Sequence, residues 1–136
     1  MYKSAIKFYN LEIEDIDTTT LGGKIKRARK LYDLTQDSLA KLTGISAPTI
    51  HELEKNINSN CTRVTLNKLC KVFPEELILT DYHKFIYRQD LYLKDVDPYV
   101  LSSALGLIPS TIKRWQNRTY IVHYDYYIKI KELGLI

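Results

Sequence analysis

Two stretches of the sequence place short polar side chains and cations directly after a glycine. Residues 44–54 read GISAPTIHELE, and residues 106–116 read GLIPSTIKRWQ, at an offset of 62 residues. Each has Gly, an aliphatic residue, a short polar stretch and Thr-Ile, and then a large apolar residue three places on. Hydroxyl, imidazole, ammonium and guanidinium groups held along one short helix can hydrogen-bond phosphate oxygens and the edges of nucleic-acid bases.

The residues around each stretch suit a helix, a tight turn and a second helix that crosses the first. Gly44 and Gly106 allow the positive φ of a turn that ends a helix. Ala40 and Ser102, four residues earlier, are small enough for the second helix to approach closely. Large apolar side chains close each corner and anchor the second helix: Ile45, Ile50 and Leu53 in one copy, and Leu107, Ile112 and Trp115 in the other. This spacing leaves the N-terminal half of the second helix outward, and in such units that end enters the DNA major groove.

The rest of the chain also reads as helical, which predicts an all-α protein. Apolar periodicity and end signals predict helices over about 21–32, 36–43, 47–55, 62–73, 75–79, 80–93, 98–105, 109–116 and 126–133. The expected N-cap residues are Thr20, Thr35, Ser46, Asp97 and Asp125. The apolar residues expected to face inward in the first three helices are Leu21, Ile25, Ala28, Leu31, Leu39, Leu42, Ile50 and Leu53.

The chain is expected to consist of an N-terminal arm over 1–20, a first module over 21–79 and a second module over 80–136. Residues 21–73 carry a net charge of +6 and residues 97–136 a net charge of +2, whereas residues 1–20 and 74–96 each carry −2. Each basic block contains one copy of the repeated pattern. This distribution suits a polyanion partner, although a solvated surface of Lys and Arg would give the same counts.

Other classes of function find little support in the residue pattern. Cys61, Cys70, His83 and His123 lack CxxC or HxxxH spacing, so no metal site is expected. The chain has no Gly-rich phosphate loop, nucleophile–base pair or pair of carboxylates at catalytic spacing, so we expect no enzymatic activity, no cofactor and no small-molecule ligand. No apolar run is long enough to span a bilayer and no signal peptide is evident, which predicts a cytoplasmic protein with reduced thiols.

Residues 21–73 resemble the phage-repressor-like XRE/Cro-type DNA-binding domain, through LTQDSLA, through GIS followed by TI and LE, and through the TLNKL helix. The resemblance implies a compact, lambda-repressor-like domain of five helices that binds operator DNA, often as a dimer on a palindrome. It also implies a bacterial or phage transcription regulator. Residues from about 97 to 134 resemble a diverged second helix-turn-helix.

The resemblance implies roles for individual residues. Gln36, with Thr35 beside it, matches the residue that clamps a phosphate at the start of the second helix. The residues expected to read bases in the first module are Ser46, Ala47, Pro48, Thr49, His51 and Glu52, and the following loop is expected to contact phosphates through Lys55, Asn56 and Asn58. The corresponding residues of the second module are Pro109, Ser110, Thr111, Lys113, Arg114, Asn117 and Arg118. Arg29 and Glu54 match a structural ion pair of the family, and Leu91 and Gln116 stand at the corresponding positions of the second module.

Two departures from the family pattern leave alternatives open. The outward face of the helix over 47–55 lacks Arg, Lys, Gln and Asn, which best read purine edges. Glu52 could accept a hydrogen bond from cytosine, but its carboxylate would also repel phosphates. In the second module Ile108 stands where a capping Ser or Thr is expected. Either module could therefore be the principal reader, and the other could serve protein contacts, including homodimer formation.

These observations predict a sequence-specific, double-stranded-DNA-binding transcriptional regulator that acts as a repressor. The alternative is a helical protein-interaction module, similar to an antitoxin or an anti-repressor, built on the same scaffold.

Overall fold

The computed structural model describes residues 13–56 and 62–136, and over these residues it contains ten helices and no strand. The predicted all-α class is therefore confirmed. The expected phosphate contact of Asn58 and the side chain of Cys61 lie outside the described residues. No helix in the described part of the chain is long and apolar enough to cross a membrane.

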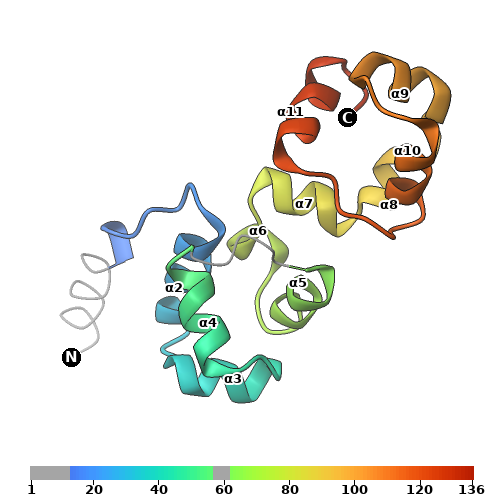
Figure 1. The fold of residues 1–136 in the computed structure, drawn as a ribbon. Helices are drawn as coiled ribbons and strands as arrows, with labels where there is room; N and C mark the ends of the chain where they lie inside the picture. The colour runs from blue at the N-terminus through green and yellow to red at the C-terminus, as the bar shows by residue number, and fades with distance from the viewer. Residues whose placement is uncertain (1–12, 57–61) are drawn as a thin grey trace. The chain divides into compact units, whose positions relative to one another are not determined.

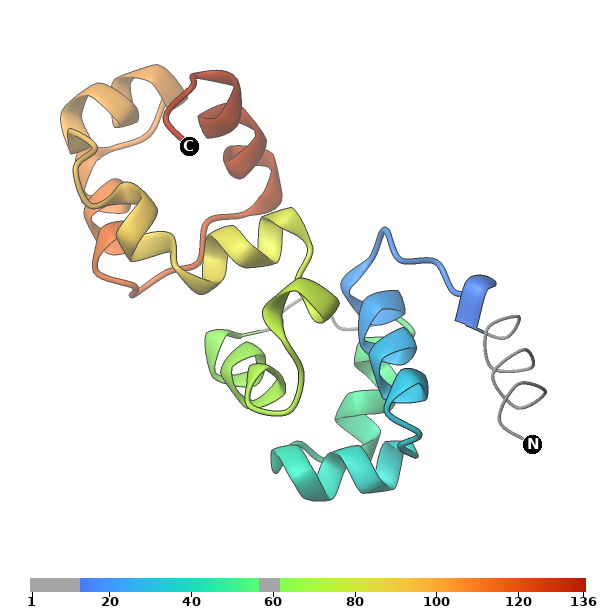
Figure 2. The same ribbon diagram turned by 180° about the vertical axis from the view of Figure 1, so that it is seen from behind.

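The chain divides into two compact units, Met1–Thr80 and Asp81–Ile136 (Figure 1). The helices of the first unit are α2 (Leu21–Leu31), α3 (Gln36–Thr43), α4 (Ala47–Glu54), α5 (Arg63–Cys70) and α6 (Glu75–Ile78). In this unit α2 packs against α4 and α6, α3 packs against α4, and α5 packs against α6 (Figure 2). The core between them is formed by Ile25, Ala28, Leu39, Ile50, Leu66, Leu69, Phe73, Ile78 and Leu79.

Hydroxyl side chains begin the first four of these helices. The expected caps Thr20, Thr35 and Ser46 accept hydrogen bonds from the backbone N–H groups three residues on, and Thr62 does the same for α5. Each such cap contributes about 1 kcal/mol to helix stability. Gly44 ends α3 with φ of 76° and donates its N–H to the Ala40 carbonyl, as the sequence predicts.

Two apolar residues that were expected to face the core are exposed instead. Leu31 is 44% exposed and Leu42 is 60% exposed. Leu31 is the last residue of α2, beyond the part of the helix that its neighbours cover. The short helix α3 packs mainly on α4. Its buried residues are Leu39 and Thr43, and the Thr43 hydroxyl donates to the Leu39 carbonyl at 2.7 Å. Leu42 lies to the side of these two residues.

The first turn of α2 is held closely on two sides. A Cβ on Gly22 would lie 2.2 Å from the Leu53 carbonyl oxygen at the end of α4. A Cβ on Gly23 would lie 1.5 Å from the Asp17 carbonyl oxygen of the arm. Only glycine fits at these two positions, because any side chain would push apart backbones that are already in contact.

The second unit contains α7 (Asp81–Tyr87), α8 (Gln89–Leu93), α9 (Pro98–Leu105), α10 (Pro109–Gln116) and α11 (Tyr124–Glu132). Here α10 packs against α8 and α9, and α7 packs against α8. Its core is formed by Phe85, Ile86, Leu93, Leu101, Ile112, Trp115, Val122, Tyr127 and Ile130. The expected inward position of Trp115 is thus observed, and Asp97 caps α9 by accepting the Tyr99 N–H at 2.9 Å.

Two expectations for this unit are wrong. The single helix over 80–93 is broken at Arg88, which has φ of −127° and ψ of 32°. The break allows Gln89 to enter the interior, where it is only 2% exposed and makes three hydrogen bonds to distant backbone groups. Asp125 is not the N-cap of the last helix. The helix α11 begins at Tyr124, two residues before the predicted start, and His123 occupies the N-cap position. Asp125 lies in the first turn of α11, where the negative charge of a carboxylate interacts favourably with the helix dipole.

The half-buried ring of His83 makes the stability of the second unit sensitive to acid. Burial lowers the pKa of this imidazole from 6.5 to about 4, so the unfolded chain binds the proton more readily than the folded one. Above pH 6.5 the ring is neutral in both states and does not lower the free energy of unfolding. That free energy falls as the pH drops from 6.5 toward 4. With allowance for partial solvent screening we expect this group to cost roughly 2 kcal/mol at pH 4.5.

Urea unfolding at pH 7.5 and pH 4.5, followed by the fluorescence of Trp115, the chain's one tryptophan, measures this effect. The loss on acidification is expected to be smaller in His83→Gln than in the parent protein. His123→Gln, at an exposed position of the same unit, serves as the matched control and should keep the parent's loss. An equal loss in all three proteins would assign the acid sensitivity to other groups.

Candidate nucleic-acid interface

The corner between α3 and α4 turns one side of α4 toward the core and the other toward solvent. Ile50 and Leu53 are buried against α2 and α3. His51 and Glu52, on the opposite side, are exposed. Of the other residues predicted to contact DNA in this module, Thr35, Ser46, Pro48 and Lys55 are exposed, and Gln36, Ala47 and Thr49 are half-buried.

Several hydroxyls of this face are engaged in starting the helices. Ser46 Oγ lies 2.7 Å from Thr49 Oγ1 and accepts the Thr49 N–H at 3.3 Å. Thr35 Oγ1 accepts the Ser38 N–H at 3.0 Å and donates to Ser38 Oγ at 2.9 Å. These side chains fix the ends of α3 and α4, so the long polar side chains that α4 directs into solvent are His51 and Glu52.

A buried ion pair holds the C-terminal end of α4. Arg29 of α2 donates two parallel hydrogen bonds to Glu54, from Nε to Oε2 at 2.8 Å and from Nη2 to Oε1 at 2.9 Å. Arg29 Nη1 also donates to the Leu34 carbonyl at 2.9 Å. Gln36 Nε2 lies 3.4 Å from Glu54 Oε1, which places the predicted phosphate clamp beside this pair. One cluster thus joins α2, the loop before α3 and the end of α4.

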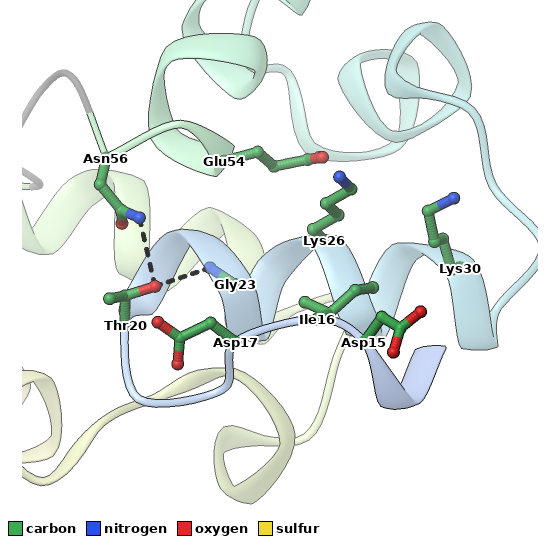
Figure 3. Close-up of a pocket in the computed structure, with 9 residues that line it drawn as sticks. All are labelled: Asp15, Ile16, Asp17, Thr20, Gly23, Lys26, Lys30, Glu54 and Asn56. Carbon is green, nitrogen blue, oxygen red and sulfur yellow. Dashed lines mark hydrogen bonds between the residues drawn. The ribbon is translucent and has the colours of Figure 1, made fainter. Parts of the chain in front are cut away.

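The residue after Lys55 has a structural role that the sequence did not reveal. Asn56 has φ of 57°. Its Oδ1 accepts the Gly22 N–H at 3.0 Å, and its Nδ2 donates to Thr20 Oγ1 at 3.2 Å, which also accepts the Gly23 N–H (Figure 3). This amide therefore ties the chain after α4 to the start of α2, and both its oxygen and its nitrogen make hydrogen bonds within the unit.

Helix α2 carries five cations, Lys24, Lys26, Arg27, Arg29 and Lys30, and only some of them are available to a polyanion. Lys24 Nζ donates to the Leu79 carbonyl at 2.7 Å, and Arg29 is paired with Glu54. Lys26 is exposed, and Arg27 and Lys30 are half-buried. Because at least two of these five cations bond within the unit, the formal charge of residues 21–73 overstates their attraction for phosphate.

A groove of about 340 Å³ runs beside α2 (Figure 3). Lys26 and Lys30 line it from α2, and Asp15 and Asp17 line it from the arm. The pKa of Asp17 is held below its ordinary value by hydrogen bonds from the Thr19 hydroxyl and backbone N–H, so its carboxylate stays charged. Carboxylates facing lysines make a poor phosphate site, and the groove does not add to the interface.

A family model described as the Cro/C1-type helix-turn-helix DNA-binding domain matches residues 24–77. Residues 24–77 are a Cro/C1-type helix-turn-helix domain. No curated protein and no solved structure matches the chain. The Cro/C1-type domain begins within α2 and ends within α6, and its α3–Gly44–α4 segment is the helix-turn-helix predicted from the sequence.

The second unit lies outside the Cro/C1-type match, but its α9–α10 corner has corresponding features. Gly106 ends α9 with φ of 71° and donates its N–H to the Ser102 carbonyl. Ile112 and Trp115 of α10 are buried, and Lys113 and Arg114 are exposed between them on the outer side. Ser110 is exposed at the start of α10, where Pro109 and Thr111 are half-buried.

Aromatic and acidic partners constrain the cations around α10. Lys113 Nζ lies 5.4 Å from the centre of the Tyr99 ring, and Arg114 Cζ lies 5.3 Å from the centre of the Tyr120 ring. Such cation–π contacts hold the charges without neutralising them. Arg118 differs, because its Nε lies 2.7 Å from Asp90 Oδ1. Asn117 Oδ1 is also occupied, by the N–H and hydroxyl of Thr119, whereas the side chains of Lys113 and Arg114 are exposed at the surface.

Gln116, which stands at the position of Glu54, is a positioning residue of the second unit. Its Nε2 donates to the Leu93 and Val96 carbonyls at 2.8 Å each. Val96 corresponds to Leu34 at the offset of 62, and Gln116 corresponds to Glu54. The carbonyl that Arg29 binds in the first unit is thus bound directly by Gln116 in the second, and Leu91, at the position of Arg29, is exposed. The sequence held one signal for this role, which is that Gln116 is a polar residue at the C-terminal end of a helix predicted to be anchored in the core.

Proposed function

We propose that the protein is a sequence-specific, duplex-DNA-binding transcriptional regulator that represses the genes beside its operator. The observation that carries the proposal is α4 of the Cro/C1-type domain, anchored by Ile50 and Leu53 and open to solvent along its other side. A helix presented in this way can lie in the major groove. A compact protein bound over a promoter blocks access by occupancy alone, and such a protein acts in the cytoplasm.

Affinity in this proposal comes from exposed cations and specificity from two reading helices. Lys26 and Lys55 of the first unit would contact phosphates and release counterions, which makes binding strongly dependent on salt. Lys113 and Arg114 on α10 are exposed, charged and held over tyrosine rings. These side chains are suited to guanine, which offers the O6 and N7 acceptors in the major groove, so α10 serves as the second reader.

The proposal predicts effects of unequal size for two side chains at corresponding positions. Arg114→Ala is expected to weaken binding to duplex DNA by about 1–3 kcal/mol, because it removes a base contact. Glu52→Ala should weaken binding much less, because the loss of its base contact is offset by the removal of a negative charge that faces DNA. Binding is measured by fluorescence anisotropy on duplex DNA over a series of salt concentrations. Lys129→Ala, an exposed cation on α11 that lies over the Tyr126 ring, is the matched control for a simple loss of charge.

A protein-interaction module is the second candidate, favoured by one specific observation. Tyr99 and Val100, near the start of α9, are 63% and 65% exposed. Large exposed apolar side chains are common at protein interfaces. Asp97 and Pro98 also occupy the positions of the phosphate clamp Thr35 and Gln36, and they offer no donor side chain. This second function would be favoured if the protein bound duplex DNA only weakly at low salt and if Arg114→Ala did not change that binding.

A further inference from the structure

We infer that the operator of this protein is asymmetric, with two unlike half-sites read by one chain. Its α4 half-site presents a cytosine to Glu52, and its α10 half-site presents a guanine to Arg114. The inference rests on the proposed function and deepens it by naming the class of DNA sequence. It follows from a comparison of the two units position by position.

The framework around the two corners is the same at the offset of 62. Leu39 and Leu101 are fully buried on the first helix of each pair, and Ile50 and Ile112 on the second. The remaining equivalent positions also agree: the capping residues Thr35 and Asp97, the left-handed glycines Gly44 and Gly106, the buried anchors Leu53 and Trp115, and the positive-φ residues Asn56 and Arg118. The φ of Asn56 is 57° and that of Arg118 is 69°. Equivalent residues of α4 and α10 therefore occupy equivalent places on the two helices.

The solvent-facing residues at these equivalent places have opposite chemistry. Glu52 corresponds to Arg114, and His51 corresponds to Lys113. All four side chains are exposed. A carboxylate accepts a hydrogen bond from the N4 amino group of cytosine, whereas a guanidinium donates to O6 and N7 of guanine. At the same register the preferred base pair is therefore reversed between the two half-sites.

Covalent connection makes one chain sufficient for both half-sites. A homodimer of chains that each carry one reading helix presents the same side chains twice and therefore selects a palindrome. Here α6 ends at Ile78 and α7 begins at Asp81, so two residues separate the helices of the two units. Such a short connection gives the second unit a high effective concentration once the first is bound. Two unlike readers on one chain select two unlike sequences.

Selection of binding sites from random duplex DNA with the full chain tests the inference. We expect a consensus of two blocks without two-fold symmetry, and a complex of one chain per duplex by sedimentation. Arg114→Gln should lose the guanine preference in one block, with about 10- to 100-fold weaker binding to the parent consensus. Glu52→Gln should change the base preference only in the other block. Glu52→Arg should reverse the preferred base pair at that position and make the two blocks more alike.

Lys129→Gln is the control and should select the parent consensus, and far-ultraviolet circular dichroism verifies that each variant is folded. A palindromic consensus occupied by two chains would overturn the inference and leave the proposed function intact. The same holds for a single-block consensus, or for one variant that alters both blocks. Failure to select any duplex sequence would overturn the proposed function together with the inference.

Discussion

Replacing Arg29 by Ala is expected to destabilise the first unit by about 3–5 kcal/mol, the usual cost of removing one partner from a buried ion pair. Glu54 has a side chain only 4% exposed, and Arg29 supplies both of its short hydrogen bonds. Without the guanidinium, the carboxylate would keep only the 3.4 Å contact with Gln36 Nε2. The Leu34 carbonyl would also lose its donor.

The measurement is urea unfolding of the full chain followed by circular dichroism at 222 nm. Trp115 fluorescence, recorded on the same samples, reports the unfolding of the second unit alone. The urea midpoint of that transition should stay the same. Lys26→Ala, an exposed cation on the same helix, should change stability by less than about 0.5 kcal/mol. The double variant Arg29→Met with Glu54→Leu should recover much of the loss, because it leaves no uncompensated charge. A loss in Arg29→Ala no larger than in Lys26→Ala would mean that the pair contributes little.

Replacing Gln89 by Leu is expected to cost the second unit about 3–5 kcal/mol. The amide Nε2 donates to the Trp115 carbonyl at 2.9 Å and to the Tyr120 carbonyl at 2.6 Å, and Oε1 accepts the Val122 N–H at 3.0 Å. Leucine has a similar volume but satisfies none of these groups. Each buried backbone group left without a partner costs about 1–3 kcal/mol, reduced where water can enter.

Trp115 fluorescence is the direct probe of this change, since the indole lies in the same core. Leu91→Ala is the matched control, because Leu91 belongs to the same helix and is exposed. Its effect should stay within about 0.5 kcal/mol. We also expect Gln89→Leu to weaken DNA binding through α10, because the Tyr120 segment that carries the ring beneath Arg114 is no longer held. A Gln89→Leu protein with the parent's urea midpoint would show that water replaces the amide without cost.

Local signals in the sequence were sufficient to predict most helices of both units. Cap hydroxyls act on backbone groups three residues away, and a C-terminal glycine acts on the turn that it closes. These effects require no knowledge of the rest of the fold, so Thr20, Ser46 and Gly44 could be assigned in advance. The Cro/C1-type helix-turn-helix was found for the same reason, because its helices, corner and anchors lie within one short segment.

The tertiary structure decided which polar side chains remain available to a partner. No local pattern indicates that Lys24 bonds to the Leu79 carbonyl, or that Asn56 bonds to Gly22 and Thr20. Such contacts join residues far apart along the chain, and local patterns carry no information about them.

The same limit explains the helix break at Arg88 and the roles of Gln89 and Gln116. By itself the sequence determined two anchored helices that follow a glycine corner. Only the folded chain determined that Arg114, on the outer side of the second, lies over the Tyr120 ring. The physical reason is that a polar side chain can bind a partner only if it is not already bonded to a nearby donor or acceptor of the protein. The tertiary fold determines which donors and acceptors are near it.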